Sequence, residues 1–462
     1  MSGLSVEQTP IPGLLVLRLD LRHDDRGWFM ESWQRTKMTA LGLPDFGPVQ
    51  SNVSFNAVRG TTRGFHAEPW DKLVTVTTGA AYGAWVDLRA GATFGTTFAV
   101  DLVPGVSVFV PRGVGNGYQT VVDDTAYSYL VNDHWRPDLA YLAVDLADPA
   151  LAIAWPVPPE ERTLSDRDRT TPLLADVTPV PRQAPLVLGA DGQLGRALLR
   201  ALPDARGVTR AELDLGDTEQ LEAWPWSGHD VVLNAAAYTA VDLAETPDGR
   251  RSAWAVNAAA PAVLARLATR HGFTLVHYST DYVYDGARAE HEEDEPLSPL
   301  GVYGQSKAAG DLAVATAPRH YVLRTSWVVG DGPNFVRTMA RLADEGASPA
   351  VIGDQVGRLS FADEIARATA HLLGSDAAYG VYHVSNGGPP TSWAGIAREV
   401  FALRGRDAAD VREVSTGEYV AGRQVAPRPQ HSLLSLRRIE ATGFEPRDAE
   451  VALRDYVASW RP

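Results

Sequence analysis

The spacing of hydrophobic and polar residues changes near the middle of the chain. Over residues 14–131, short runs of β-branched and aromatic residues are separated by turns that carry Gly or Pro, such as Thr78-Gly79 and Pro104-Gly105. Short strands with regular turns indicate an antiparallel sandwich or barrel. The pattern predicts strands at residues 14–19, 72–78, 81–87, 97–102, 106–110 and 125–131.

The second half of the chain has a different pattern. Apolar runs of three or four residues are separated by segments rich in Ala, Leu and Arg with helical spacing, as in residues 262–268. Alternating strands and helices predict a parallel, doubly wound α/β sheet. The expected strands lie at residues 186–188, 231–233, 275–278 and 321–323.

Residues 169–184, between these halves, consist largely of Thr, Pro and small residues and offer little to bury. We interpret this segment as a linker. A chain of 462 residues is also too long for one ordinary hydrophobic core. We therefore predict a first domain at residues 1–170, a linker at 171–184 and a second domain at 185–462.

Composition narrows the classes of protein further. The hydrophobic fraction of 45% and the charged fraction of 21% are typical of a globular enzyme. No apolar run approaches the ~20 residues that a membrane helix needs, residues 1–20 lack the pattern of a secretory signal, and the chain has no Cys. We expect a cytoplasmic protein without membrane contact or disulfides, and we predict no metal site. The formal net charge of -15 argues against a nucleic-acid partner.

A glycine-rich loop follows the first strand expected in the second half. Gly189, Gly192 and Gly195 come after the apolar run at 186–188 and open a helical segment at 194–202. In this context the backbone N–H groups and the positive end of the helix can hold a pyrophosphate. The sequence therefore predicts a dinucleotide-binding site.

Two further motifs in this half suit the reduction of a ketone. Tyr303 and Lys307 lie four residues apart on one face of an expected helix, where the ammonium can lower the pKa of the phenol. The same spacing is also common for a surface tyrosine beside a solvated lysine. Thr280 ends an expected strand, where it can hydrogen-bond the carbonyl of a substrate. Because the three elements occur in the right order, we predict that Tyr303 is the proton donor of a reductase.

Five segments of the second half strengthen this prediction: 234–242 (NAAAYTAVD), 279–286 (STDYVYDG), 324–328 (RTSWV), 354–357 (DQVG) and 428–432 (RPQHS). From about residue 185 to the end, the chain resembles dTDP-4-dehydrorhamnose reductase, a family of extended short-chain dehydrogenases. The resemblance implies a Rossmann fold with a small substrate-binding lobe, NADPH or NADH as cofactor, and a dTDP-linked 4-keto-6-deoxy sugar as substrate. It makes Thr280, Tyr303 and Lys307 catalytic.

The loop, the helix and the resemblance together give the candidate site residues of the second half. Arg210 follows the second expected strand and could meet the 2′-phosphate of NADPH, although a solvated arginine is equally common there. The predicted cofactor contacts are Gly189, Gly192, Gln193, Leu194, Arg210, Asp214, Leu215, Ala235, Ala236, Ala237, Tyr303 and Lys307. The predicted substrate contacts are Asp281, Tyr282, Trp327 and Arg428. The family continues its Asp-Gln-x-Gly motif with x-Pro-Thr, where this chain has Arg358-Leu359-Ser360, so the substrate detail there stays open.

The first half carries residues suited to proton transfer next to a ketone. Asp168, bonded to one ring nitrogen of His66, would fix the tautomer of the imidazole and stabilise the imidazolium that forms when His66 accepts a proton. Lys72 could stabilise the enolate oxygen, and Tyr129 could return a proton from the opposite face. A lone histidine is more often structural, and Tyr127 and Tyr129 could equally be the packed face of a strand.

The order of seven short segments points to a second family: 25–31 (DRGWFME), 50–54 (QSNVS), 63–66 (RGFH), 72–74 (KLV), 86–89 (VDLR), 93–95 (TFG) and 164–168 (LSDRD). Over about residues 5–170 the chain resembles dTDP-4-dehydrorhamnose 3,5-epimerase. The resemblance implies a cupin-like jelly roll that needs no cofactor and works as a homodimer. It makes His66 the base, Asp168 its partner, Tyr129 the donor and Lys72 an enolate contact. It assigns the dTDP group to Arg26, Glu31, Gln50, Asn52, Arg63 and Arg167.

Several positions depart from the epimerase family. Asn116, a further candidate substrate contact, replaces the histidine of a Pro-x-Gly-x-x-His-Gly stretch. Glu68 stands where Gln is often found, and Trp135 and Ala140 stand where Tyr and Glu are common. An altered substrate, or inversion at only one carbon, is compatible with these changes.

Three hypotheses remain at the level of the sequence. The first is a bifunctional enzyme that inverts C3 and C5 of dTDP-4-dehydro-6-deoxy-glucose and reduces C4, giving dTDP-L-rhamnose. The second is a reductase whose first half only binds substrate or dimerises, and the third is a nucleotide-sensing scaffold. Retention of the acid and base residues in both halves favours the first. The number of inverted carbons, the choice of NADPH or NADH, and magnesium binding by the reductase stay open.

Overall fold

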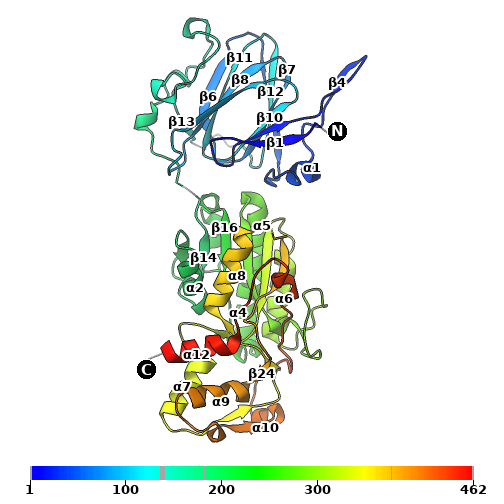
Figure 1. Cartoon of the computed structure of the whole chain (residues 1–462), viewed down its shortest axis with the longest axis vertical. Helices are drawn as coiled ribbons and strands as arrows, with labels where there is room; N and C mark the ends of the chain where they lie inside the picture. Colours follow the sequence, from blue (N-terminus) through cyan, green and yellow to red (C-terminus); the bar gives the residue numbers. More distant parts are fainter. Residues whose placement is uncertain (1–2, 136–140, 182, 376, 460–462) are drawn as a thin grey trace. The chain divides into compact units, whose positions relative to one another are not determined.

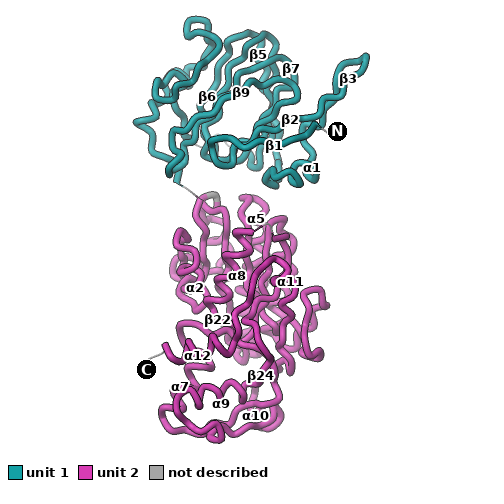
Figure 2. Tube along the Cα trace, in the orientation of Figure 1, with its two compact units in different colours: residues 1–182 teal, residues 183–462 magenta. Residues whose placement is uncertain are grey.

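The computed structural model describes residues 3–135, 141–181, 183–375 and 377–459. The chain divides into two compact units, residues 1–182 and 183–462 (Figure 2). Each unit has hydrophobic clusters built from its own part of the sequence.

The first unit is an all-β sandwich of the jelly-roll type (Figure 1). One antiparallel sheet contains, in spatial order, β1 (Ser5–Gln8), β2 (Leu15–Arg18), β10 (Val106–Val110), β7 (Lys72–Thr78), β12 (Thr125–Val131) and β5 (Gln50–Asn56). The other contains β13 (Leu142–Ala143), β6 (Thr62–Ala67), β11 (Val114–Thr120), β8 (Ala81–Asp87) and β9 (Thr97–Leu102). A separate hairpin pairs β3 (Arg22–Asp24) with β4 (Gly27–Phe29), and α1 spans Arg35–Thr39.

Apolar side chains fill the space between these sheets and cover both outer faces. Val74 and Tyr127 of the six-stranded sheet meet Trp85 and Tyr118 of the five-stranded sheet, and the rings of Tyr118 and Tyr127 stack with centroids 4.0 Å apart. The segment around α1 covers one outer face and residues 144–155 cover the other. Strands such as β10 are therefore buried on both faces, which explains their continuous apolar runs.

The second unit is built on a six-stranded parallel sheet. In spatial order the strands are β15 (Arg206–Val208), β14 (Leu186–Leu188), β16 (Val231–Asn234), β17 (Thr274–Thr280), β18 (His320–Thr325) and β23 (Gly380–His383). One face is covered by α2 (Gln193–Ala201), α8 (Ala362–Gly374) and α11 (Arg437–Glu440). The other is covered by α3 (Thr218–Ala223), α5 (Ala260–His271) and α6 (Val302–Val314), with α4 (Pro247–Trp254) against α6. The strand order reverses between β14 and β16, the kind of position where open α/β sheets bind ligands.

A smaller lobe completes the second unit (Figure 1). Its core joins α7 (Phe335–Asp344), α9 (Trp393–Leu403) and α12 (Ala449–Ser459). Its short strand pairs are β19 (Val328–Val329) with β22 (Ser360–Phe361), β20 (Ala350–Ile352) with β25 (Arg412–Val414), and β21 (Val356–Gly357) with β24 (Thr391–Ser392), and α10 spans Thr416–Val420. The predicted fold class, a jelly roll followed by a Rossmann fold with a small lobe, is confirmed.

All ten predicted strands are present, and β7 to β10, β12 and β14 have the predicted bounds. The predicted runs do not include β5, β6 and β11. The sequence of β11 contains Gly115 and Gly117, a composition that reads as a turn. A Cβ on Gly117 would lie 2.9 Å from the ring of Phe65, so glycine is needed where this strand passes that side chain.

The segment predicted as a linker packs on the first unit for much of its length. Val180 makes two backbone hydrogen bonds of 2.8 Å to the segment that follows β8. Val177 is buried in the core of the first unit, and Leu174 packs against the same cluster. These contacts anchor residues 174–180 on the first unit despite the surrounding prolines, so part of the segment expected as a linker packs on that unit.

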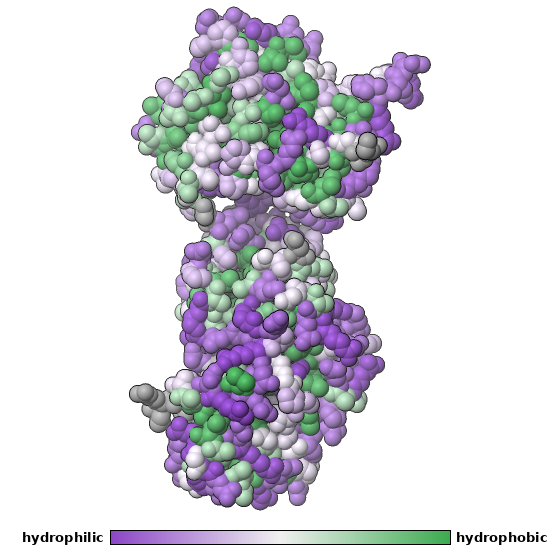
Figure 3. Space-filling view, viewed as in Figure 1, coloured by the Kyte–Doolittle hydropathy of each residue, from purple (hydrophilic) through white to green (hydrophobic). Residues whose placement is uncertain are grey.

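The surface in Figure 3 mixes polar and apolar residues on both units. In the first unit, exposed large apolar side chains include Trp28 and Phe29 on the β3–β4 hairpin and Val53 and Phe55 on the edge strand β5. Within the described ranges, no helix is long and apolar enough to cross a membrane. The cytoplasmic location stays a prediction.

Candidate active sites

His66 and Asp168 form the first pair of candidate catalytic groups. His66 lies on β6, where Phe65 and Ala67 pack on the outer face, so the alternation of a strand turns His66 toward the space between the sheets. Its Nε2 atom lies 2.8 Å from Oδ1 of the buried Asp168. Burial opposes ionisation of this carboxyl, but the hydrogen bond and charge of His66 keep the pKa of Asp168 below its ordinary value. An ionised Asp168 can therefore orient the imidazole, as predicted.

Lys72 and Tyr129 face the same space from the opposite sheet. Lys72 lies on β7 in line with the inward-facing Val74, and Tyr129 lies on the adjacent strand β12. The Nζ atom of Lys72 is 5.3 Å from the centroid of the Tyr129 ring. Burial raises the pKa of Tyr129, so its hydroxyl stays protonated at neutral pH. The predicted base therefore comes from one sheet, and the predicted donor and enolate contact come from the other.

Asn116 lies beside His66 on the inner face of the five-stranded sheet, since the two residues are direct partners across β11 and β6. Its Oδ1 atom accepts hydrogen bonds of 2.9 Å from Nε1 of Trp85 and from the hydroxyl of Tyr127. Two donors fix the orientation of this buried amide, and Nδ2 remains as its donor group. Tyr127 is therefore a buried core residue whose hydroxyl holds Asn116. Tyr129, two residues later, is only half-buried.

The predicted dTDP contacts divide into two groups in the structure. Gln50 and Asn52 lie on β5, joined by a hydrogen bond of 2.9 Å, and Asn52 is the strand partner of Tyr129. Arg63 on β6 donates to Asn56, and Arg167 lies over the ring of Tyr141 next to Asp168. Arg63 lies on the strand of His66 and Arg167 precedes Asp168, whereas Gln50 and Asn52 lie on β5, which pairs with the strand of Tyr129.

Arg26 and Glu31 are not brought to this site within a single chain. Arg26 pairs with Asp24 at the tip of the β3–β4 hairpin, which projects from the sandwich (Figure 1). Glu31 pairs with Lys37 on α1. The predicted position of Ala140 lies outside the described residues.

The glycine-rich loop of the second unit has the geometry of a phosphate cradle. Gly189 has a φ of +75°, and a Cβ there would lie 2.9 Å from the backbone of Ala236. Gly192 is the N-cap of α2, and it has no side chain to cap the helix. The first N–H groups of α2 therefore have no side-chain acceptor and point a positive helix end at the loop.

The remaining predicted cofactor residues contribute in different ways. Ala235, Ala236 and Ala237 follow β16 and are half-buried beside the loop. Gln193 accepts from the N–H of Gly330 and donates to the carbonyl of Pro333, so its side chain ties α2 to the lobe. Leu194 and Leu215 pack in the hydrophobic clusters that flank the sheet, which leaves their backbone as the only polar part.

Arg210 stands at the end of β15, where a 2′-phosphate contact is expected. Its side chain is 82% exposed and pairs with Asp214 at 3.1 Å. Such an exposed pair contributes about 1 kcal/mol or less, so the guanidinium can exchange Asp214 for a phosphate.

Thr280, Tyr303 and Lys307 come together at the carboxyl end of β17 and the start of α6. The hydroxyl of Tyr303 hydrogen-bonds that of Thr280, which in turn donates to Oδ1 of Asp281 at 3.0 Å. The expectation that Lys307 lowers the pKa of Tyr303 is wrong for this structure, because burial and the nearby Asp281 raise the pKa of the phenol. A phenol that keeps its proton suits a proton donor.

Lys307 is held by groups that the sequence analysis did not single out. Its Nζ atom donates to the carbonyl of Tyr278 at 2.6 Å and lies 3.2 Å from Nε2 of the buried His277. The other ring nitrogen of His277 lies 3.1 Å from the amide of Asn234. Burial lowers the pKa of Lys307 to about 8. A polar residue inside the apolar run 275–278 is the signal that could have marked His277.

Two of the predicted substrate contacts, Asp281 and Tyr282, lie next to Tyr303. Burial raises the pKa of Asp281 to about 6, although hydrogen bonds with Ser432 and Thr280 act in the opposite direction. Tyr282 packs edge-on against Tyr303 and hydrogen-bonds Arg428, which also binds Asp242 at 2.9 Å. A buried carboxylate beside the phenol is suited to accept a hydroxyl of a sugar.

Trp327 has a backbone conformation that is uncommon for a bulky residue, with a φ of +46°. Its ring stacks on Trp393 with centroids 3.9 Å apart, and Gly357 lies against its edge. Packing on both sides holds the strained residue in place, as is common at ligand sites.

The departure at Arg358-Leu359-Ser360 lies within the packing of the second unit. Arg358 donates to the carbonyls of Gly388 and Leu434, and Leu359 is buried. Ser360 keeps a hydroxyl that hydrogen-bonds Ser385. These contacts are structural and place none of the three side chains on the predicted catalytic groups.

Asn257 is a further buried polar residue that the sequence analysis missed. It lies in a π-helical turn, Ala255–Ala259, between α4 and α5. Its amide makes two hydrogen bonds with the backbone of Tyr238 and one with Ser306, which follows Tyr303 on α6. The single Asn within an alanine-rich helix is the available signal.

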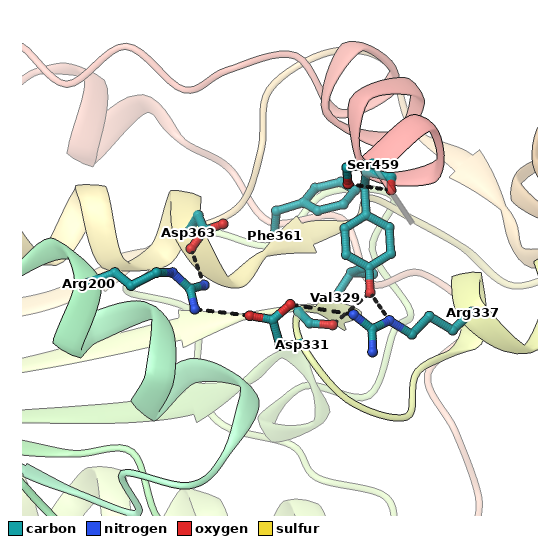
Figure 4. A pocket seen from close by; sticks show the side chains of 9 residues that line it. Arg200, Val329, Asp331, Arg337, Phe361, Asp363 and Ser459 are labelled. Atoms are coloured by element: carbon teal, nitrogen blue, oxygen red, sulfur yellow. Dashed lines mark hydrogen bonds and ion pairs between the residues drawn. The ribbon is translucent and has the colours of Figure 1, made fainter. Parts of the chain in front are cut away.

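A pocket of about 340 Å³ lies where α2 and α8 meet the lobe (Figure 4). None of the predicted site residues lines it. Arg200 bridges Asp331 and Asp363, and Arg337 pairs with Asp331 beside Tyr456. Since these charges compensate one another, the pocket joins the lobe to the sheet and has no excess charge for an anion.

The chain matches two family models, the RmlD substrate binding domain over residues 184–461 and dTDP-4-dehydrorhamnose 3,5-epimerase over residues 8–176. The first unit is 45% identical over 177 residues to the protein RmlC homolog of Streptococcus pyogenes serotype M6, covering 37% of this chain and 89% of that protein. The second is 36% identical over 293 residues to dTDP-4-dehydrorhamnose reductase of Aggregatibacter actinomycetemcomitans, covering 59% of this chain and 98% of that protein.

A solved structure is also similar to the second unit. It is dTDP-4-dehydrorhamnose reductase of Bacillus anthracis in complex with NADP, with a TM-score of 0.56 and 30% identity, covering 60% of this chain and 99% of that one. The first unit therefore belongs to the dTDP-4-dehydrorhamnose 3,5-epimerase family, and the second belongs to the dTDP-4-dehydrorhamnose reductase family.

Proposed function

We propose that this chain is a bifunctional enzyme that epimerises and then reduces a dTDP-linked 4-keto-6-deoxy sugar. The proposed substrate is dTDP-4-dehydro-6-deoxy-glucose, and the proposed product is dTDP-L-rhamnose. The observation that carries the proposal is that one chain assembles two complete proton-transfer sets, one in each unit. A binding module would have no need for the first set.

In the first unit, His66 removes the proton from the carbon next to the C4 ketone. The electrons of the broken C–H bond move to the C4 oxygen, and the ammonium of Lys72 stabilises the enolate that forms. Tyr129 then delivers a proton to the opposite face of the same carbon, which inverts it. Support comes from the placement of His66 and Tyr129 on opposite sheets. The same cycle at C3 and at C5 gives the doubly inverted sugar.

In the second unit, Tyr303 donates its proton to the C4 oxygen during reduction. A nicotinamide dinucleotide, when bound, supplies the hydride. Gly189 and the uncapped start of α2 fit its pyrophosphate. The hydroxyl of Thr280 supports the phenol and the substrate oxygen, while Lys307 provides positive charge next to them.

The proposed cofactor is NADPH, with NADH as the alternative. Arg210 is exposed at the end of β15, where it can meet a 2′-phosphate. The similar Bacillus anthracis reductase was solved with NADP. Replacing Arg210 with Ala should weaken NADPH more than NADH, measured as the ratio of the two kcat/KM values.

We also propose that the chain is a homodimer through its first unit. The edge strand β5 exposes Val53 and Phe55, and the projecting hairpin exposes Trp28 and Phe29. A second copy would cover these side chains and would give Arg26 and Glu31 a site to reach. Light scattering should show two chains per particle, and Phe55→Lys should shift the mass toward one chain.

Complementation between two variants tests the bifunctional proposal. The His66→Ala variant should form no L-rhamnose product because it does not epimerise the keto-sugar. The Tyr303→Phe variant should form none because it does not reduce the keto-sugar. A mixture of the two should restore the product, since each supplies the step that the other lacks. If His66→Ala alone made dTDP-L-rhamnose at the wild-type rate, the first unit would be a binding module.

A further inference from the structure

The mechanism above leaves one buried acid of the first site without a role. Glu68 follows β6 by one residue, and its Oε2 atom contacts the ammonium of Lys72. The two side chains are 12% and 7% exposed. The described residues provide Oε2 with no hydrogen-bond partner apart from this ammonium. The contact therefore joins the enolate-binding lysine to a carboxylate in a region with little water.

The other charged groups around Lys72 have their own partners. Across the space between the sheets, His66 and Asp168 bind each other at 2.8 Å. From the adjacent strand β12, the neighbouring groups are the neutral phenols of Tyr129 and Tyr127.

The residue before Lys72 is acidic as well, but its carboxylate is used elsewhere. Asp71 accepts from the backbone N–H of Arg112 at 2.9 Å and from the amide of Asn132 at 3.0 Å. Glu68 is thus the acid that this geometry assigns to Lys72.

Burial and the carboxylate act on the lysine in opposite directions. Burial disfavours the ammonium and lowers the pKa of Lys72 to about 7. A carboxylate in contact favours the ammonium, because separating the two charges in a medium of low dielectric is costly. The pKa of about 7 holds with Glu68 in contact, so without this carboxylate the pKa of Lys72 would lie lower still and much of the lysine would be neutral at about pH 7. A neutral amine cannot offset the negative charge of an enolate.

We propose, on the basis of the epimerase function proposed above, that Glu68 is a positioning residue that keeps Lys72 protonated, so that an ammonium faces the C4 oxygen when the enolate forms. Glu68 itself exchanges no proton with the sugar. Its carboxylate holds Nζ near the Tyr129 ring and keeps a larger fraction of the lysine charged near neutral pH. Where Gln is often found at this position in the family, the amide could hold Nζ but could not stabilise its charge.

The test is the pH profile of solvent deuterium incorporation into the keto-sugar, measured by NMR without NADPH between about pH 5 and about pH 9. In wild type, exchange should fall as the pH rises through the pKa of Lys72, about 7. In Glu68→Gln, this fall should move down by about one pH unit or more, with about a tenfold loss above the wild-type pKa and little loss near the acidic end. The substitution keeps the shape of the side chain and removes only its charge.

A second variant and a control separate this role from a structural one. In Glu68→Gln/Lys72→Arg, the fall should move to a higher pH than in wild type, because a guanidinium stays charged whatever its neighbour. The control is Asp71→Asn, which removes a neighbouring acid of similar burial: the side chain of Asp71 is 19% exposed and that of Glu68 is 12% exposed. This variant should lose exchange at the same pH as wild type. The urea unfolding transition of the first unit, measured for each variant, shows whether that unit is folded.

Two results are decisive in different ways. If the profile of Glu68→Gln overlies that of wild type, or lies below it by the same factor at every pH, Glu68 does not set the charge of Lys72. If wild type shows no exchange at any pH while it still oxidises NADPH, the proposed epimerase activity itself is wrong, and the role of Glu68 falls with it.

Discussion

Both candidate sites contain a buried lysine among their predicted catalytic groups, but they hold it differently. Lys72 contacts a carboxylate, whereas Lys307 is held by a backbone carbonyl and by the imidazole of His277. Enolisation places a full negative charge on the C4 oxygen, and reduction pairs the charge with a proton from Tyr303. The difference between the two lysine environments follows the difference between these reactions.

Tyr303→Phe should lower NADPH oxidation by about 100-fold or more, because removing a positioned proton donor costs about that much. Lys307→Ala should have a similar effect. Both variants should keep solvent deuterium exchange into the keto-sugar, since enolisation needs only the first unit. A wild-type rate of reduction by Tyr303→Phe would show that α6 does not carry the donor.

The base and the donor of the first unit should give different phenotypes. His66→Ala should stop exchange at both carbons, because the proposed base is lost. Tyr129→Phe should still exchange, yet fail to complete inversion, because only delivery to the opposite face is lost. NMR of the recovered sugar distinguishes retention with deuterium from inversion. Equal loss of exchange in both variants would contradict the division of roles.

Asn116 should matter for stability as well as for the site. Asn116→Ala would leave the buried donors of Trp85 and Tyr127 without an acceptor. Unpaired buried donors cost about 1–3 kcal/mol each, so the unfolding transition of the first unit should move to clearly lower urea. An unchanged transition would mean that water replaces the amide. The sequence indicated a substrate contact at this position, and the supporting hydrogen bonds become visible only in the fold.

At the scale of elements, the sequence predicts best where one local pattern decides the structure. The strands β7, β8, β9, β10 and β12 are continuous runs with clear turns, and the Tyr303 to Lys307 spacing fits one face of α6. The strand β11 could not be predicted from its local pattern, because its glycines are required by the ring of Phe65 on another strand, which leaves no room for a Cβ. The packing of residues 174–180 could not be predicted for a similar reason, since a few apolar side chains dock this segment on distant parts of the first unit.

The start of α2 offers a test at this scale. Gly189→Ala should weaken NADPH binding at least tenfold, because the residue has a positive φ and a Cβ would press on the backbone of Ala236. Gly374→Ala is the matched control, since a Cβ at the end of α8 meets nothing within 4 Å. Fluorescence titration of NADPH compares the two. Equal affinities would place the pyrophosphate elsewhere.

At the scale of the whole molecule, the chain joins two reactions of which the first is reversible. An epimerase that works through an enolate need not favour its product, and a reductase on the same chain removes that product as it forms. Tethering also raises the local concentration of one site near the other. Each unit has its own core and its own predicted catalytic groups, so the advantage that we infer for the fusion is kinetic.

The measurement that tests the bifunctional claim most directly follows deuterium through both steps. Wild type is incubated with dTDP-4-dehydro-6-deoxy-glucose and NADPH in deuterated water, and the product is assigned by NMR. The account predicts dTDP-L-rhamnose that carries deuterium at C3 and at C5, with one NADPH oxidised per sugar. A reduced sugar with no deuterium at either carbon would contradict it, because the first unit would then have removed no proton.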